Sequence, residues 1–180
     1  LPWQRARSVT SSATKVYYAT EWAVVEIDKA ERSPRFLYKT QGFNDVGVRL
    51  VRFNRTANAL FVAYNNSNID LYYPATEKVV NLPFIVKNTI LTGDKNIKNI
   101  FFEGENAFIA TGFGALKLNL RTAEVDFTVF TGVAVNAFAI LSANYYMGTD
   151  DGLFRVAIND VNPADFSRWQ LLDSAQGFSG

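Results

Sequence analysis

Histidine and cysteine are both absent from the 180 residues of this sequence. A chain without cysteine forms no disulfide bond, no thiolate metal site and no cysteine nucleophile. A chain without histidine lacks the commonest general base and the usual zinc ligand. We therefore expect no catalytic residue, no metal site, no cofactor and no enzymatic activity.

Excess charge of one sign and long apolar runs are also missing. The 18 basic residues are balanced by 17 acidic residues, whereas a nucleic-acid-binding protein carries a clear basic excess. No run reaches the roughly 18 apolar residues that a membrane-spanning helix needs. The apolar stretch 133–141 is interrupted by Asn136. The sequence therefore predicts neither a nucleic-acid partner nor a transmembrane segment.

Apolar and aromatic side chains, in contrast, are abundant. Hydrophobic residues make up 48% of the chain and aromatic residues 14%, with 15 phenylalanines. This composition is sufficient for the core of one domain built from β-sheets packed on one another. The chain begins Leu1-Pro2, without an initiator methionine or a signal peptide, so we expect a mature or excised part of a longer protein.

The stretch 97–120 predicts three short strands in succession. A turn at 103–105 separates the first strand from the second, and Gly112-Phe113-Gly114 separates the second from the third. Glycine suits this hairpin because it accepts positive φ without a Cβ clash. From 115 to 120 apolar and polar residues alternate, as in a strand with one buried face. Such a meander exposes too much edge and apolar surface to be stable alone, so it needs copies beside it.

Copies of this pattern occur along the whole chain. When a central small residue is used as the anchor, the series is Ala19, Ala63, Ala110 and Gly148, with spacings of 44, 47 and 38 residues. Units of this length with several strands each are typical of propeller blades. We expect a small residue at the anchor because neighbouring blades pack face to face there.

The repeats predict an all-β fold, a β-propeller with four consecutive blades of four-stranded antiparallel sheets. The blades are expected at about 1–42, 43–84, 96–131 and 132–173. Residues 176–179 repeat residues 41–44 after 135 positions. We therefore expect 174–180 to be a connector to a fifth blade, and the chain to be part of a larger ring of seven blades.

Within the first blade, the pattern predicts an inner strand in residues 1–10 and an outer strand at 35–40. Trp3 and Val9 are its expected buried positions. Residues 83–95 form the longest expected connection, since they contain Pro83 and a Gly-Asp pair. No helix of three turns or more is expected.

Four polar residues stand at matching places in the expected inner strands. They are Arg7, Arg49, Lys98 and Asn136, with one inserted residue allowed in the second blade. Inner strands line the central channel of a propeller, so these residues can form a mostly basic ring that attracts an anionic ligand. The alternative is that one side of each inner strand is simply solvated.

Other candidates have simpler structural interpretations. Asp150-Asp151-Gly152 is the nearest match to a calcium loop, but Asp-Gly favours a hairpin turn there. The tyrosine pairs at 17–18, 72–73 and 145–146 should place one ring in the core and the other on the opposite face. The outward rings either stack on sugars or pack between adjacent blades, and packing is the commoner role.

The sequence also resembles known propellers. Residues 147–154 and the connector 42–46 look like repeats of periplasmic sensor propellers. The order of motifs across 42–51, 68–71, 97–120 and 162–169 more specifically resembles the family of PorZ amino-terminal propellers from the type IX secretion system of Bacteroidota. Its most specific parts are the Gly-Phe-Gly hairpin and the Asn-Pro-Ala-Asp-Phe-Ser loop. Trp22-Ala23 departs from the Asn-Gly pattern of the other members.

The resemblance implies a non-enzymatic subunit of the attachment complex at the cell surface, exported through the periplasm and peripheral to the outer membrane. It implies the sortase PorU, PorV and PorQ as partners, with anionic lipopolysaccharide as the molecule delivered to the sortase. It carries over no catalytic motif. The complete family member is much longer and has a second propeller and a carboxy-terminal secretion signal.

Three functions therefore remain open from the sequence. The first is a binding and scaffold module in type IX secretion. The second is the ligand-sensing propeller of a hybrid two-component regulator, which would be followed by a transmembrane helix and a histidine kinase. The third is a polysaccharide-active enzyme, which requires a convergent carboxylate pair that no motif singles out.

Overall fold

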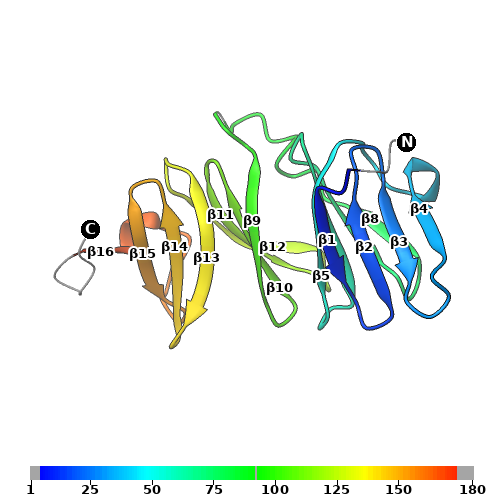
Figure 1. Ribbon diagram of the computed structural model, residues 1–180. Coiled ribbons are helices and arrows are strands. Elements are labelled where there is room, and N and C mark those ends of the chain that lie inside the picture. The colour runs from blue at the N-terminus through cyan, green and yellow to red at the C-terminus, as the bar shows by residue number, and fades with distance from the viewer. Residues whose placement is uncertain (1–4, 92, 174–180) are drawn as a thin grey trace. The chain divides into compact units, whose positions relative to one another are not determined.

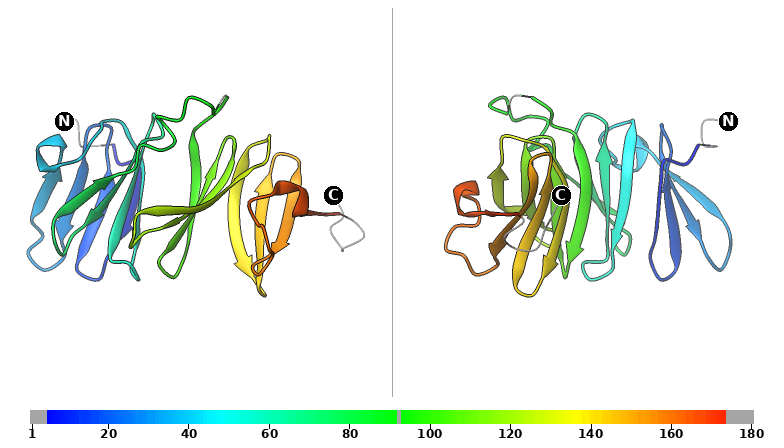
Figure 2. Two further views of the ribbon diagram at one scale, coloured as in Figure 1. Left: turned by 180° about the vertical axis from the view of Figure 1, so that it is seen from behind. Right: turned by 60° about the vertical axis from the view of Figure 1, so that its left-hand side comes forward.

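The chain folds almost entirely into β-strands. The computed structural model describes residues 5–91 and 93–173, in which the strands form four four-stranded antiparallel sheets. In each sheet the strands lie side by side in chain order (Figures 1 and 2). Each sheet is one propeller blade, so the all-β propeller fold expected from the repeats is confirmed.

The blades are numbered in chain order. Blade 1 contains β1 (Ser8–Ser11), β2 (Lys15–Ala19), β3 (Val24–Asp28) and β4 (Pro34–Leu37). Blade 2 contains β5 (Val48–Asn54), β6 (Ala59–Tyr64), β7 (Ile69–Tyr73) and β8 (Lys78–Asn81). Blade 3 contains β9 (Ile97–Glu103), β10 (Asn106–Thr111), β11 (Gly114–Asn119) and β12 (Glu124–Phe130). Blade 4 contains β13 (Val135–Leu141), β14 (Asn144–Thr149), β15 (Gly152–Ala157) and β16 (Gln170–Leu172). Two short 3-10 helices, η1 (Lys39–Gln41) and η2 (Phe166–Arg168), lie among the strands.

The chain divides into two compact units. Unit 1, Leu1–Ile90, holds blades 1 and 2, and unit 2, Leu91–Gly180, holds blades 3 and 4. The division falls in the long connection between β8 and β9, where a loop was expected.

Unit 1 has a core between its two blades. Tyr17 of blade 1 stacks on Phe53 of blade 2 with ring centroids 5.6 Å apart. Phe43, in the connector between the blades, contacts Tyr72 at the same centroid distance of 5.6 Å. All four side chains are buried. The connector therefore contributes to the core and is not only a link between sheets.

The core of unit 2 is richer in aromatic rings. Phe108 of blade 3 stacks on Phe138 of blade 4 at 4.6 Å and lies 5.4 Å from Tyr145. Trp169 closes the group from the end of blade 4, 6.5 Å from Tyr145. The pattern of one buried ring per tyrosine pair is confirmed, because Tyr17, Tyr72 and Tyr145 are buried while the tyrosine after each is partly exposed.

The small anchor residues lie where blades pack. Ala19 belongs to the buried cluster between blades 1 and 2, and Ala110 to the cluster between blades 3 and 4. Both are 0% exposed, as is Ala63. At Gly148 a Cβ atom would meet only the Cβ of Ala137, at 3.8 Å, so this position has room for a methyl group.

Two expectations for blade 1 are wrong. Val9 is 63% exposed, because the hydroxyls of Ser8 and Thr10 on either side of it face β5 and alternation turns Val9 the other way. The outer strand was expected at 35–40, but β4 ends at Leu37. The chain turns there into η1, which begins at Lys39 and ends at Gly42 with φ +91°. Trp3 and the connector 174–180 lie outside the described residues.

The hairpin at Gly112-Phe113-Gly114 needs glycine for two different reasons. Gly114 has φ +150°, and a Cβ atom there would lie 1.9 Å from the carbonyl oxygen of Val129. Gly112 does not have positive φ, which corrects the expectation for this residue. A Cβ atom on Gly112 would lie 2.4 Å from Asp94, so close packing excludes a side chain there.

Candidate functional site

The four inner-strand residues singled out from the sequence occupy equivalent places. Arg49, Lys98 and Asn136 are each the extra residue at a β-bulge in the first strand of their blade. The next residue then pairs with the anchor: Ser8 with Ala19, Leu50 with Ala63, Asn99 with Ala110, and Ala137 with Gly148. Arg7 precedes Ser8 in the same way, and its N–H donates to the carbonyl of Ala19 at 2.9 Å. Two of the four positions lie in unit 1 and two in unit 2.

Two of these residues have partners within their own blade. Arg7 forms an ion pair with Glu21 at 3.6 Å, and the amide nitrogen of Asn136 donates to Asp150 at 2.7 Å. Glu21 and Asp150 occupy the same place in the turn between the second and third strands. Glu21 therefore offsets the charge of Arg7, and Asp150 fixes the side chain of Asn136.

The other two residues are cations without partners. Arg49 is exposed and Lys98 is partly exposed. Among residues 5–91 and 93–173, neither side chain forms an ion pair or hydrogen bond. The reason lies in the turn, because the place of Glu21 and Asp150 is taken by Asn65 in blade 2 and by Gly112 in blade 3. Both cations are thus available for an anionic group.

The turn between the second and third strands is held by a threonine that the sequence analysis did not single out. Thr20, Thr111 and Thr149 directly follow the anchors of blades 1, 3 and 4. Each hydroxyl donates to a carbonyl three residues on, at 3.0, 2.7 and 3.0 Å. Each also accepts a backbone N–H from the turn. The signal was present in the sequence as a small residue followed by threonine.

Blade 2 replaces this threonine with Tyr64 and a buried acid. Asp70 is 0% exposed, and its carboxyl group accepts the hydroxyl of Tyr64 at 2.6 Å and the amide of Asn81 at 2.8 Å. The backbone N–H and the side-chain amide of Asn44 complete the set at 2.8 and 2.9 Å. Burial, together with the nearby charge of Asp70, raises the pKa of Tyr64. This network fixes the connector 42–45 to β7.

The turns and the connector of unit 1 are joined through one glycine. The N–H of Gly47 donates to the carbonyl of Glu21 at 2.9 Å, and its carbonyl accepts the N–H of Asn65 at 2.9 Å. The turn of blade 1, the connector and the turn of blade 2 therefore form one hydrogen-bonded surface at the end of the unit that carries Arg7 and Arg49.

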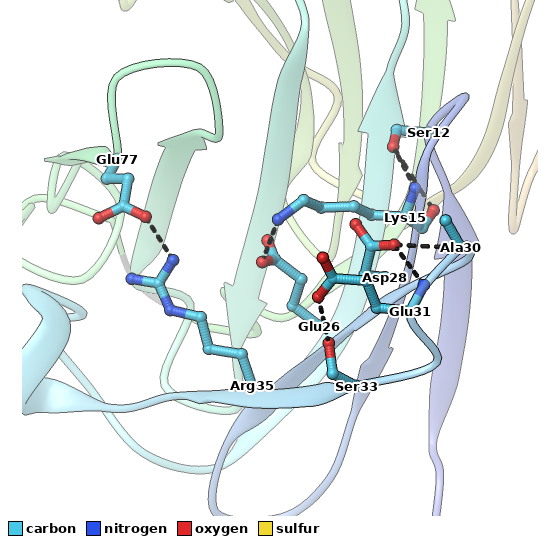
Figure 3. Close-up of polar contacts among 9 residues, drawn as sticks. All are labelled: Ser12, Lys15, Glu26, Asp28, Ala30, Glu31, Ser33, Arg35 and Glu77. Carbon is cyan, nitrogen blue, oxygen red and sulfur yellow. Dashed lines mark hydrogen bonds and ion pairs between the residues drawn. The ribbon is translucent and has the colours of Figure 1, made fainter.

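A second polar cluster links blades 1 and 2 (Figure 3). Lys15 donates to the buried Glu26 at 2.5 Å, and Arg35 of β4 pairs with Glu77 in the turn between β7 and β8. Burial raises the pKa of Tyr72 to about 12, and the charge of Glu26 adds to this effect. Hydrogen bonding to Arg35 lowers the pKa of Glu77. The cluster thus connects the blades through charges as well as packing.

One part of this cluster is not fully satisfied. Within the described part of the chain, the hydroxyl of Tyr17 and the Oε2 atom of Glu26 are buried without a hydrogen-bond partner. Burial first, and then the charge of Glu26, raises the pKa of Tyr17. The cluster therefore favours the protonated form of Tyr17.

In residues 5–91 and 93–173, no group of three or more acidic side chains is arranged to hold a metal ion. The turn Asp150-Asp151-Gly152 is a hairpin held by Thr149, with Gly152 at φ +128°. No helix in residues 5–91 or 93–173 is long and apolar enough to cross a membrane.

The repeated blades, their small anchors and their matching turns define the chain as four consecutive blades of a β-propeller. Within that class, the chain belongs to the family described as "TSS9, PorZ, N-terminal beta-propeller domain", whose model matches residues 13–170. The resemblance seen in the Gly-Phe-Gly hairpin and the Asn-Pro-Ala-Asp-Phe-Ser loop is thereby confirmed.

Solved structures show the same fold. PorZ, a surface component of the type IX secretion system of Porphyromonas gingivalis, superposes with a TM-score of 0.86 at 23% identity over 94% of this chain and 22% of its own. The extracellular domain of a hybrid two-component system from B. thetaiotaomicron gives a TM-score of 0.69 at 15% identity, over 94% of this chain and 22% of its own. The computationally designed Ika4 protein gives 0.65 at 12% identity, over 86% of this chain and 92% of its own. No curated protein matches the sequence. The chain spans about a fifth of the length of the first two structures.

Proposed function

We propose that this chain is a non-enzymatic binding and scaffold module of the type IX secretion attachment complex at the outer face of the outer membrane. In that complex it takes part in delivering anionic lipopolysaccharide to the sortase PorU, together with PorV and PorQ. Arg7 and Arg49 in unit 1, and Lys98 and Asn136 in unit 2, each contribute to binding of the anionic ligand.

Family membership over residues 13–170 supports the secretion role, and the inner-strand bulges support the ligand. Arg49 and Lys98 occupy equivalent bulges and have no acidic partner among the described residues. An unpaired cation on a rigid strand attracts phosphate or carboxylate without first breaking an internal ion pair. The pair Arg49 and Lys98 is therefore the observation that carries the proposed anion binding.

A second candidate is the ligand-sensing propeller of a hybrid two-component regulator. The observation that favours it is the similarity to the extracellular domain of such a system over 94% of this chain. The two candidates differ outside the propeller. A transmembrane helix and a histidine kinase would accompany the sensor, whereas a second propeller and a secretion signal would accompany the attachment subunit.

The test is a pull-down with purified anionic lipopolysaccharide, run on this chain and on the longer protein that contains it. We expect the chain to bind. Combining Arg49→Glu with Lys98→Glu should weaken binding by about tenfold or more, because two attractive charges become repulsive. Circular dichroism checks that the fold is retained.

The matched control combines Arg55→Glu with Lys87→Glu. It makes the same change in net charge at two exposed cations outside the bulges. Binding that falls equally in the control reflects net charge alone and rejects the proposed site. Binding by the longer protein only would move the ligand site out of these four blades. Co-purification with PorU, PorV and PorQ tests the proposed partners separately.

A further inference from the structure

Three residues whose side chains have no partner within the described part of the chain belong to segments that meet at Gly47 in unit 1. Gly47 binds the carbonyl of Glu21, next to Trp22, and accepts the N–H of Asn65. Arg49 follows two residues later at the bulge of β5. The turn after β2 and the connector that leads into β5 lie at the same end of this unit (Figure 1). The backbone hydrogen bonds therefore bring Trp22, Asn65 and Arg49 to one surface.

Trp22 is exposed on a turn that cannot easily rearrange. Trp22 is 54% exposed, while the hydroxyl of the buried Thr20 accepts the backbone N–H of Trp22 at 3.3 Å and that of Ala23 at 3.1 Å. The equivalent ring in blade 3, Phe113, is only 8% exposed and lies 6.0 Å from Phe130. No other ring in the described residues covers Trp22. More than half of its surface is therefore accessible to a ligand.

Asn65 and Gly47 are in close contact. Gly47 has φ +76°, and a Cβ atom there would lie 2.9 Å from the side-chain nitrogen of Asn65. The amide of Asn65 therefore lies over the glycine, where any other residue would displace it. Asn65 is exposed, and within the described chain its amide has no hydrogen-bond partner. Both its donor and its acceptor remain available.

We propose that Trp22, Asn65 and Arg49 form a binding site for a saccharide that carries a phosphate or carboxylate group. The indole stacks on the apolar face of a sugar ring, since an aromatic ring offers flat apolar area with little loss of entropy. The amide of Asn65 binds ring hydroxyls as donor and acceptor. The guanidinium of Arg49 binds the anionic group with two parallel N–H donors.

The choice of a saccharide follows from the balance of chemistry at this surface. Within the connector 42–46, Val46, 47% exposed, is the one large apolar side chain that is exposed. One indole and one valine give little area for a protein interface, which usually has a larger apolar core. An amide and an unpaired guanidinium suit a polar, charged sugar. The inference rests on the proposed function, because it assigns sugar recognition to the same end of unit 1.

The experiment measures binding of delipidated anionic polysaccharide, prepared from the lipopolysaccharide, by calorimetry and tryptophan fluorescence. Trp22→Ala should weaken binding by about tenfold, the equivalent of an aromatic contact of about 1.4 kcal/mol. Trp22→Phe should keep most of the affinity but lose the fluorescence change. Asn65→Ala should weaken binding by about fivefold, and Asn65→Asp should weaken it more, because it adds a negative charge.

Phe130→Ala is the matched control, because Phe130 is an equally exposed aromatic residue, 56%, in unit 2. It should bind like the unaltered protein. If Trp22→Ala and Asn65→Ala bind normally while Arg49→Glu with Lys98→Glu does not, this inference fails and the proposed function stands. If the unaltered protein binds intact lipopolysaccharide but not the delipidated polysaccharide, this inference fails and the proposed function stands. If neither this chain nor the longer protein binds either molecule, the proposed function itself fails. If Trp22→Ala loses PorU, PorV or PorQ but keeps the polysaccharide, the surface is a protein interface and the inference is wrong.

Discussion

The junction between blades 1 and 2 differs from the junction between blades 3 and 4 in the chemistry that joins the sheets. Both junctions pair an anchor alanine with a facing blade, and both bring two inner strands next to each other, β1 with β5 and β9 with β13. The backbone plan is therefore shared. In unit 1, hydrogen bonds between the inner strands are added to an aromatic core, whereas in unit 2 the contacts are mainly aromatic.

In unit 1, side chains of β1 bind the backbone of β5. The hydroxyl of Ser8 accepts the N–H of Val51 at 3.2 Å, and the hydroxyl of Thr10 accepts the N–H of Phe53 at 3.0 Å. Arg52 also donates to Ser8, at 3.1 Å. These bonds fix the register of one blade against the next, because each hydroxyl fits only one amide.

In unit 2, the equivalent contacts are made by rings. Asn99 and Phe101 occupy the places of Ser8 and Thr10. Phe101 lies 6.2 Å from Phe108 of its own blade, and Phe108 in turn stacks on Phe138 of blade 4 at 4.6 Å. Aromatic packing buries a large apolar area but constrains the orientation of the two blades less strictly. Hydrogen bonds bury little area but fix which residues face each other. The comparison shows that a repeated blade can be joined to its neighbour by either kind of contact.

The largest effect is expected from removing the central ring of unit 2. Phe108→Ala should lower the free energy of unfolding by about 3–5 kcal/mol, because it leaves a cavity among rings that cannot close it. Hydrogen exchange should show the loss of protection in β9–β15 and not in β1–β8. A loss spread equally over both units would contradict the separation of the two cores. Phe130→Ala, at an exposed ring, is the control.

A smaller effect is expected from the buried acid of unit 1. Asp70→Ala should lower the free energy of unfolding by about 3 kcal/mol, because it removes the acceptor of the buried Tyr64 hydroxyl and of the donors of Asn44 and Asn81. Denaturant unfolding combined with hydrogen exchange should place the loss in β5–β8 and in the connector 42–45.

The control for Asp70 is Asp126→Ala, which removes a more exposed carboxyl paired with Lys117 at 2.8 Å. This change should lower the free energy of unfolding by no more than about 1 kcal/mol. Equal losses from the two substitutions would mean that the polar network of blade 2 contributes no more than a surface ion pair.

The smallest effect concerns alkaline pH. The pKa of Tyr72 is raised from 10.0 to about 12, so above pH 10 the unfolded chain loses this proton while the folded chain keeps it. Stability should therefore fall as the pH rises from 10 to 12, and Tyr72→Phe should reduce this fall. Thermal unfolding of the unaltered protein and of Tyr72→Phe between pH 8 and pH 12 measures this loss of stability. A difference between them that does not grow with pH would contradict the assignment.

The sequence was sufficient to predict the blades and the strand order of each blade. Anchors spaced by about one blade length and alternating residues such as those of β11 identify strands, because a strand with one buried face must alternate. The bulge residues were also aligned correctly in the sequence. The bulge itself was not predicted, because one extra residue leaves almost no mark on a pattern of period two.

Other features could not be read from the order of residues. Asp70 would face water on most strands, and it is buried because Asn44, Tyr64 and Asn81 reach it from three separate segments. Val9 looked like a core residue, but Ser8 and Thr10 use the inner side of β1. In each case the deciding contact joins residues far apart in the chain.

The sequence by itself determined the class of fold and the family, because both depend on local repeats and on motifs that persist along the chain. Only the tertiary structure decided which cations are free. Arg7 and Arg49 are alike in sequence, but the turn of one blade supplies Glu21 and the turn of the other supplies Asn65. A charge is neutralised by what the fold places beside it, and that neighbour is set by strand pairing and not by position in the sequence.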